Sequence, residues 1–424
     1  MTHPSRLTLY QAITLAVMVV GYTGYYAGRS NFSVALPLLI DELVAQGWSA
    51  TDARTRLGGI ASLGVLAYAI GKFASGTLTE IAGGRRAFLA GMVLSALCTV
   101  AFALSGSVPL FTSAWVANRL VQSTGWVGMV KMTSRWFGHS TYARAMGIVS
   151  LSFLFGDALV RWAMGRVLAT GAGWRTLFFL AASLLVILAV VSGRLLRESP
   201  RDRGLAEPEA HPENLFAAEG PAEKVAIGAL WGRLASSPAF WSVCAVSLAL
   251  TLLRETFNTW TPTFFVQSVG LSESSAASWS ALFPLAGGVA VLGAGWLGDR
   301  TGRTGRAWVM IVGLLATAAC LLALGGVGRS PVGAVSLVAL IGFLMLAPYS
   351  YLAGAISLDF GGKHGSAAAC GVIDGVGYLG GVLAGGGVAR LAAAAGWGGA
   401  FATLSGIALA GALAAGVYLK LLRR

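Results

Sequence analysis

Charged side chains are scarce in this chain, and acidic ones are scarcer than basic ones. Charged residues make up 11% of the 424 positions, with 17 Asp and Glu against 30 Lys and Arg. Soluble globular domains carry about 25% charged residues. A disordered chain would be highly charged and poor in apolar residues. The composition therefore argues against both a soluble domain and a disordered protein.

Cysteine and histidine are also few, with four residues of each type. The cysteines stand singly in apolar stretches, so neither a disulfide framework nor a metal-ligand spacing is visible. Three histidines fall outside the predicted helices and His364 stands at the very start of one, so we expect no histidine proton relay within a membrane. Because nucleophile elbows, metal-ligand clusters and ATP motifs are missing too, we expect no cofactor, no metal, and neither an enzyme nor a primary pump. The cysteines are Cys98, Cys244, Cys320 and Cys370.

Long apolar runs make up most of the chain, and 56% of its residues are hydrophobic. A run of about 18 or more such residues can cross a bilayer as a helix. The runs predict an all-α membrane protein with twelve transmembrane helices. They cover roughly residues 9–39, 57–80, 86–106, 109–137, 142–168, 174–196, 238–268, 276–298, 307–327, 331–359, 364–393 and 397–420.

The net charge of +13 reflects membrane topology and not a nucleic-acid partner. Most Lys and Arg outside the helices fall in segments that the helix count places on one side, with Arg54, Arg175 and Arg390 among the exceptions. By the positive-inside rule, both termini are cytoplasmic. The first apolar run is too long for a cleaved signal and is read as a retained helix. We expect a multi-pass protein of a bacterial inner membrane, with the lipid bilayer as its surroundings.

The chain contains an internal repeat. Two segments of the first half recur in the second half at nearly the same separation. The first is Gly76-Thr-Leu78-Thr-Glu80, which recurs as Gly295-Trp-Leu297-Gly-Asp299, and the second is Gly173-Trp174, which recurs as Gly396-Trp397. One long polar stretch, rich in Pro, Glu and Arg, lies between the copies and indicates a flexible cytoplasmic linker. The predicted organisation is a six-helix half over 1–196, a linker over 197–237 and a second six-helix half over 238–424.

Each half places an arginine deep inside an apolar helix. Arg29–Pro37 and Arg254–Pro262 share the pattern R-x-x-F-x-x-x-x-P. An arginine within the membrane costs roughly 2.5–3.5 kcal/mol on insertion scales and usually marks a functional site. The bland alternative is that each side chain reaches to a headgroup, but both positions lie near the predicted midplane. Arginine suits an anion because its planar fork binds phosphate through two hydrogen bonds. We therefore expect an anion site between the halves.

The repeated segments resemble those of the major facilitator superfamily, whose G-x-L-x-[DE] turns occur here in both halves. The segment Gly21–Pro37 is similar, more narrowly, to the organophosphate:inorganic phosphate antiporter family. Further matches are Gly71-Lys72-Phe73, Gln122 with Gly125-Trp126, Trp260-Thr-Pro262 and Gly377-Tyr378-Leu379. The resemblance implies a rocker-switch carrier whose substrate phosphate lies between Arg29 and Arg254. It implies a cavity lined also by Lys72, Tyr22, Tyr26, Trp126 and Tyr378.

The chain departs from the glycerol-3-phosphate carriers of that family at several points. Gly156 stands where they place a histidine, Ser30 where they place a lysine and Thr259 where they place an acid. The last two changes remove one opposite-charge pair together. Four charged residues are additions, and we group them as a charge network or coupling set. They are Arg119, Asp157, Arg161 and Asp374.

Two readings stay open for each charged helix residue. Lys72 could face the cavity or pair across the two halves with Asp374, which lies at a similar depth. Asp157 and Arg161 are helical i, i+4 neighbours, and Asp157 could neutralise Arg161, Arg119 or both. This cluster could be a buried structural network or could contact substrate directly.

Several functions therefore compete. The first is exchange of an organophosphate or phosphonate for phosphate, by a monomer with a small anionic substrate. The second is proton-driven symport of an organic anion by the same fold. A non-transporting sugar-phosphate sensor and a membrane enzyme are the others. The sequence does not specify the organic group.

Overall fold

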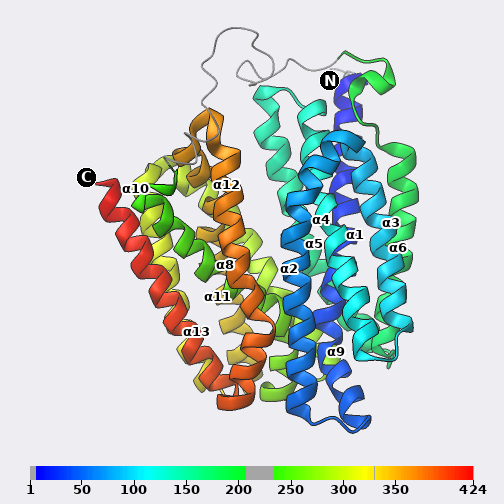
Figure 1. Cartoon of the computed structure of the whole chain (residues 1–424), viewed down its shortest axis with the longest axis vertical. Helices are drawn as coiled ribbons and strands as arrows, with labels where there is room; N and C mark the ends of the chain where they lie inside the picture. Colours follow the sequence, from blue (N-terminus) through cyan, green and yellow to red (C-terminus); the bar gives the residue numbers. More distant parts are fainter. Residues whose placement is uncertain (1–5, 207–233, 329, 424) are drawn as a thin grey trace. The chain divides into compact units, whose positions relative to one another are not determined.

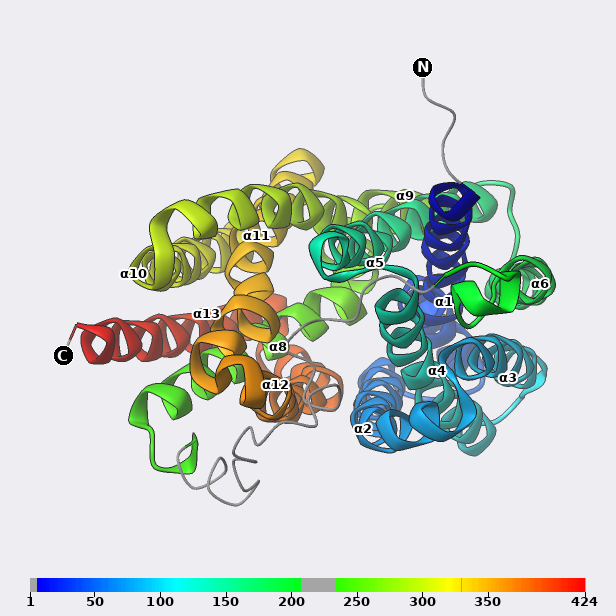
Figure 2. The same ribbon diagram turned by 90° about the horizontal axis from the view of Figure 1, so that it is seen from above.

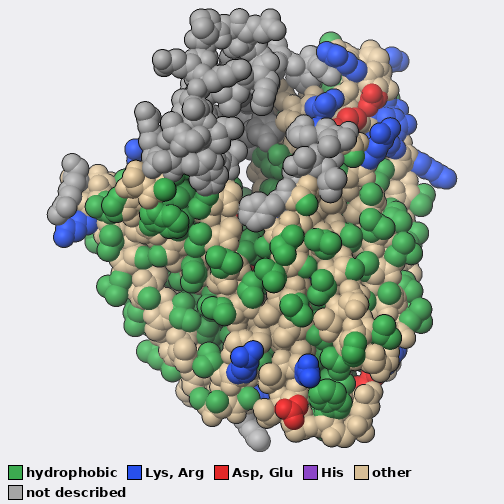
Figure 3. All heavy atoms as spheres, in the orientation of Figure 1, with side chains coloured by type: hydrophobic (Ala, Val, Ile, Leu, Met, Phe, Trp, Pro, Cys, Tyr) green, Lys and Arg blue, Asp and Glu red, His purple; other side chains and the backbone are tan. Residues whose placement is uncertain are grey.

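The computed structural model describes residues 6–206, 234–328 and 330–423. The described part is helical and contains no β-strand (Figure 1). Within it, nine helices are long and apolar enough to cross a membrane. Hydrophobic side chains cover the middle of the helices on the face in Figure 3, while Lys and Arg gather near the helix ends. Such a surface suits a lipid environment because apolar side chains there meet lipid tails.

The described residues fall into two compact units. Unit 1 comprises the described residues within Met1–Leu38 and Leu63–Ala217, and unit 2 those within Leu39–Ser62 and Ala218–Arg424. The first helices are α1 (Arg6–Ala45), α2 (Ala50–Ala82), α3 (Gly84–Leu104), α4 (Val108–Trp136), α5 (His139–Leu168), α6 (Trp174–Leu195) and the 3-10 turn η1 (Pro200–Arg203). They are followed by α8 (Pro238–Phe264), the π-helical η2 (Phe265–Val269), α9 (Glu273–Ser280), α10 (Leu282–Gly326), α11 (Pro331–Tyr351), the π-helical η3 (Leu352–Ile356), α12 (Ser357–Ala384) and α13 (Gly386–Leu422).

The tip of the α1–α2 hairpin, Leu39–Ser62, groups with unit 2 because it makes close contacts there. Ser62 Oγ donates to the carbonyl of Val382 and accepts from the N–H of Gly386 at 2.9 Å. The two compact units therefore have different boundaries from the two halves that the sequence repeat predicts. The predicted division at 197–237 stays a prediction. The linker positions 207–233 lie outside the described residues.

Glycines end or bend the helices at the repeated turns. Gly83, between α2 and α3, has φ 91° and ψ 150°, and Gly302 inside α10 has φ 62° and ψ −160°. Gly396 bends α13 with φ 66° and ψ 179°. This backbone region is essentially restricted to glycine. The bends divide α10 and α13 close to the predicted helix boundaries. Several motif side chains, including those of Leu78, Glu80 and Asp299, lie outside the described part, so the turns are compared by backbone alone.

Within each unit the helices pack against one another, and Figure 2 shows them from above. In unit 1, α3 packs against α4 and α6, and the buried Tyr25 donates to the carbonyl of Phe88 at 2.5 Å. In unit 2, α10 packs against α11 and α13, and α8 against α12 and α13. Ser247 of α8 donates to the carbonyl of Ile373 on α12 at 2.8 Å. These contacts fix the helices that carry Arg29 and Arg254.

The predicted run 364–393 is not one continuous helix. Helix α12 ends at Ala384, and Gly385 has φ −77° and ψ −91° before α13 begins. Three successive glycines, 385–387, lower the cost of this break because glycine lacks the side chain that restricts the backbone. The carbonyl of Gly58 also approaches Gly385 so closely that a side chain there would clash.

Candidate functional site

Arg29 lies on α1 within a polar and aromatic cluster in unit 1. Its Nε donates to Gln122 Oε1 on α4 at 3.2 Å, and its Nη1 donates to Tyr26 Oη at 3.2 Å. Gln122 is held in turn, because its Nε2 donates to Ser95 Oγ at 3.0 Å. Nη2 is buried without a hydrogen-bond partner. The fork is thus oriented through two nitrogens, while the donors of its third nitrogen meet no acceptor among the described residues.

Tyr68 on α2 gathers three cations around one ring. Its ring centre is 4.7 Å from Arg29 Cζ, 4.7 Å from Arg119 Cζ and 5.5 Å from Lys72 Nζ. The tyrosine is only 3% exposed, so the cations share a buried aromatic surface. The negative face of an aromatic ring attracts cations, more strongly when water is excluded. Unit 1 therefore concentrates positive charge beside Arg29.

The predicted aromatic lining of unit 1 has two roles. Tyr26 touches the guanidinium of Arg29 directly, with 4.8 Å between Cζ and the ring centre. Tyr22 packs behind it, 5.7 Å from the Tyr26 ring and 5.8 Å from the Trp126 ring. Tyr22 is 2% exposed and belongs to the core of unit 1. Tyr22 is thus a core residue beside the cluster, while Trp126 is half-buried and its place in the cavity lining stays a prediction.

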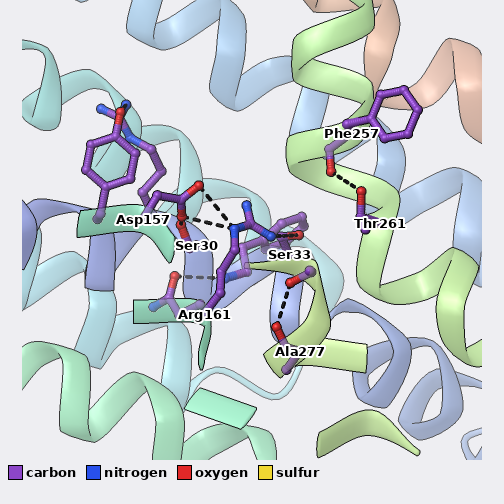
Figure 4. Close-up of polar contacts among 12 residues, drawn as sticks. Ser30, Ser33, Asp157, Arg161, Phe257, Thr261 and Ala277 are labelled. Atoms are coloured by element: carbon purple, nitrogen blue, oxygen red, sulfur yellow. Dashed lines mark hydrogen bonds and ion pairs between the residues drawn. The ribbon is translucent and has the colours of Figure 1, made fainter. Parts of the chain in front are cut away.

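Asp157 and Arg161 on α5 form a buried pair that ties α5 to α1 (Figure 4). Arg161 Nε donates to Asp157 Oδ1 at 3.0 Å and Oδ2 at 3.1 Å. Ser30 Oγ donates to Asp157 Oδ1, and Arg161 Nη1 donates to Ser33 Oγ at 3.4 Å. Ser30 is thus an uncharged donor to Asp157. These side chains form a buried charge network that includes Ser30, the residue next to Arg29 in the chain.

Arg254 lies on α8 in unit 2 and has a carboxylate partner. Its Nη2 donates to Glu255 Oε1 at 2.7 Å. Its Cζ lies 4.4 Å from the ring centre of Tyr349 and 5.9 Å from that of Tyr378. Its Nε is buried and has no hydrogen-bond partner in the part of the chain that the structure describes. Arg254 therefore has aromatic neighbours, as Arg29 does, but its charge is already balanced.

The predicted site residues divide between the two units. Arg29, Tyr26, Lys72 and Arg119 come together in unit 1, and Arg254 and Tyr378 in unit 2. Lys72 and Asp374 belong to different units, so their pairing stays a prediction. No cluster of three or more His, Cys, Asp or Glu able to hold a metal occurs among the residues that the structure describes.

Three residues of these clusters were not singled out from the sequence. Tyr68 lies one helical turn before Lys72, and this spacing was the available signal. Glu255 directly follows Arg254, which was also visible. Tyr349 on α11 has no charged neighbour in sequence, so only folding reveals it.

The chain is similar to known proteins over most of its length. The family model of the Major Facilitator Superfamily matches residues 18–385. A probable hexose phosphate transport protein of Chlamydia trachomatis is 26% identical over 406 residues, covering 92% of this chain and 87% of that protein. A glycerol-3-phosphate transporter of Bacillus subtilis is 25% identical, covering 88% and 84%. A bacterial homologue of the lysosomal transporter Spinster, solved inward-facing and unoccupied, shares the fold with a TM-score of 0.75 and 16% identity, covering 99% and 98%.

Proposed function

Because the chain belongs to the Major Facilitator Superfamily, we propose that it is a secondary transporter of small phosphorylated or phosphonate organic anions. It exchanges them for inorganic phosphate by alternating access. As a multi-pass membrane protein it resides in a bacterial inner membrane with both termini in the cytoplasm.

The observation that carries this proposal is the unfilled fork of Arg29. Nη2 is buried with no acceptor, and within the described part of the chain the guanidinium pairs with no carboxylate. A buried donor left unpaired costs about 1–3 kcal/mol or more. A phosphate group offers the missing oxygen acceptors and the negative charge together. Lys72 and Arg119, on the same Tyr68 ring, add further positive charge for a dianion.

Two relatives support the chemical class of the substrate, because one is a probable hexose phosphate transport protein and the other a glycerol-3-phosphate transporter. Arg254 supplies the second cation of the proposal, with Tyr349 and Tyr378 beside it. The sequence repeat leads us to expect that one substrate engages Arg29 and Arg254. The aromatic rings provide a surface for the organic group.

Binding tests the proposed substrate class. The purified full-length protein is heated with a panel of organophosphates, phosphonates and their non-phosphorylated counterparts, and the melting temperature is recorded. A ligand that binds only the folded state raises this temperature. We expect stabilisation by phosphorylated or phosphonate compounds and by inorganic phosphate, but not by the counterparts. Equal stabilisation by compounds without a phosphoryl group would contradict the proposal.

A further inference from the structure

The two arginine clusters differ in charge. Arg29 has no carboxylate partner within the described part of the chain, whereas Arg254 Nη2 contacts Glu255 Oε1 at 2.7 Å. The Arg254 and Glu255 side chains are 15% and 11% exposed. A pair this sheltered is screened less by salt than a surface pair. Glu255 thus neutralises Arg254 while the site is empty of anions.

The pair is not one that helix geometry provides. Neighbouring residues on a helix do not face each other, whereas residues three or four apart do. Asp157 and Arg161 of α5 follow that spacing, but Glu255 must turn towards the guanidinium of the adjacent Arg254. Glu255 fills one nitrogen of the fork and leaves Nε buried without a partner. The carboxylate therefore meets only part of the hydrogen-bonding capacity of Arg254.

A phosphate group would use the same fork more fully. Carboxylate and phosphate both present oxygens that a guanidinium binds through parallel hydrogen bonds. An anion that reaches Nη2 and Nε together must first take Nη2 from Glu255. Once displaced, Glu255 would remain a negative charge close to the bound anion and would repel it.

We propose that Glu255 is a built-in competitor of the substrate anion at Arg254, an inference that rests on the proposed phosphate-binding function. Glu255 occupies the guanidinium in the empty protein, and the substrate phosphate displaces it. The competition weakens apparent affinity, because only the fraction of molecules with an open Arg254 binds. A pair open about a tenth of the time weakens binding about tenfold. Glu255 thereby keeps the affinity low enough for release, which a carrier needs.

The test uses Glu255→Gln, which keeps the shape and removes the charge. Phosphate is titrated against the purified full-length variant, and the binding constant is taken from the rise in melting temperature. We expect a lower melting temperature without ligand, because the pair is lost, and inorganic phosphate binding about tenfold tighter. A structural role alone predicts the first change without the second. Glu255→Ala is the second variant and should also bind phosphate more tightly.

Asp359→Asn is the matched control. Asp359 accepts from Arg306 Nη2 at 2.9 Å in the same unit, with side-chain exposures of 16% and 14%. Removing this charge should lower the melting temperature without tightening phosphate binding, because Arg306 is not an anion site in this proposal.

The outcomes separate the two proposals. Unchanged or weaker phosphate binding by both Glu255 variants, with binding by the parent protein intact, would overturn the competitor role and leave the proposed function standing. Weaker binding of an organophosphate alone would instead make Glu255 a contact of the organic group and also overturn it. Failure of both variants to fold, while Asp359→Asn folds, would make Glu255 structural. No binding of phosphate or of the organic panel by any form would overturn the proposed function itself.

Discussion

At the scale of single residues, the chemistry of Arg29 depends on the shape of its guanidinium as much as on its charge. Nε and Nη1 are held by Gln122 and Tyr26, which aims Nη2 as a fixed donor. A lysine in its place would carry the same charge on a single nitrogen and could not reproduce this geometry.

Arg29→Lys should therefore cripple transport while leaving the protein folded and inserted. A hydrogen bond to a charged group contributes about 1.5–3 kcal/mol, so phosphate binding should fall roughly ten- to hundredfold. Phosphate titration and uptake measure the loss, with Arg166→Lys, an exposed arginine of the same unit, as the control. Near-normal uptake by Arg29→Lys would remove the main argument for a phosphate site.

A second prediction at this scale concerns Tyr68. Its ring centre lies 4.7 Å from Cζ of Arg29 and of Arg119 and 5.5 Å from Lys72 Nζ. Tyr68→Phe keeps the ring and loses only the hydroxyl, so its melting temperature should fall less than that of a variant without the ring. Tyr68→Leu removes contacts worth about 0.5–2 kcal/mol per cation and should lower it clearly. Bound phosphate should restore part of the melting temperature lost in Tyr68→Leu, because it places negative charge beside Arg29. Equal melting temperatures for the two variants would show that the cations do not depend on the ring.

Single residues also show how far sequence reasoning extends. The intramembrane arginines were recognised because charge within an apolar run is costly and therefore rare. Tyr68 was missed because its role depends on how α2 is rotated relative to α1 and α4, which hydropathy does not report. Glu255 was missed because adjacent helix residues are not expected to interact.

At the scale of elements, α5 is fastened to α1 by charge and hydrogen bonding. The Asp157 and Arg161 side chains are 5% and 3% exposed, and both reach serines of α1. The i, i+4 spacing predicted the contact between the two. The serines could not be predicted, because they come from another helix.

Breaking this pair from one side should be strongly destabilising. Asp157→Asn leaves Arg161 buried without its counter-charge, at roughly 3–5 kcal/mol. The double variant Asp157→Asn, Arg161→Met should lose less unfolding free energy than the two single variants lose together, since both charges are then gone. Thermal unfolding of the four forms measures the coupling. Additive losses would mean that the two side chains stabilise the fold independently.

The glycine turns show a second kind of predictability. The repeat pointed to equivalent turns, and Gly83 and Gly302 both adopt backbone angles that only glycine tolerates easily. Sequence could predict these because glycine is the residue such a turn requires. The break at Gly385 was placed inside a predicted helix, because a glycine within an apolar run is also compatible with close helix packing.

At the scale of the whole molecule, the membrane fold was predictable and is confirmed by the match to the Major Facilitator Superfamily. Hydropathy determines which segments cross a membrane, and the duplicated pattern suggested their pairing into halves. Hydropathy gives no information on which hairpin tip packs with which helices. The grouping of Leu39–Ser62 with unit 2 was therefore beyond the sequence.

The proposed exchange has an electrostatic reason at this scale. Arg29, which pairs with no carboxylate among the described residues, disfavours an empty site, and a phosphate dianion balances its charge. Exchange then needs no titrating carrier group. Asp157, one member of the predicted charge network or coupling set, already accepts hydrogen bonds from Arg161 and Ser30.

Phosphate counterflow tests this account most directly. Proteoliposomes containing the purified protein are loaded with phosphate or left empty, and uptake of labelled phosphate or organophosphate is followed with and without an ionophore that collapses the pH gradient. We predict uptake only into loaded vesicles, undiminished by the ionophore. Uptake into empty vesicles that vanishes when the gradient is collapsed would contradict exchange and favour proton symport. Binding without any uptake would contradict transport and favour a sensor.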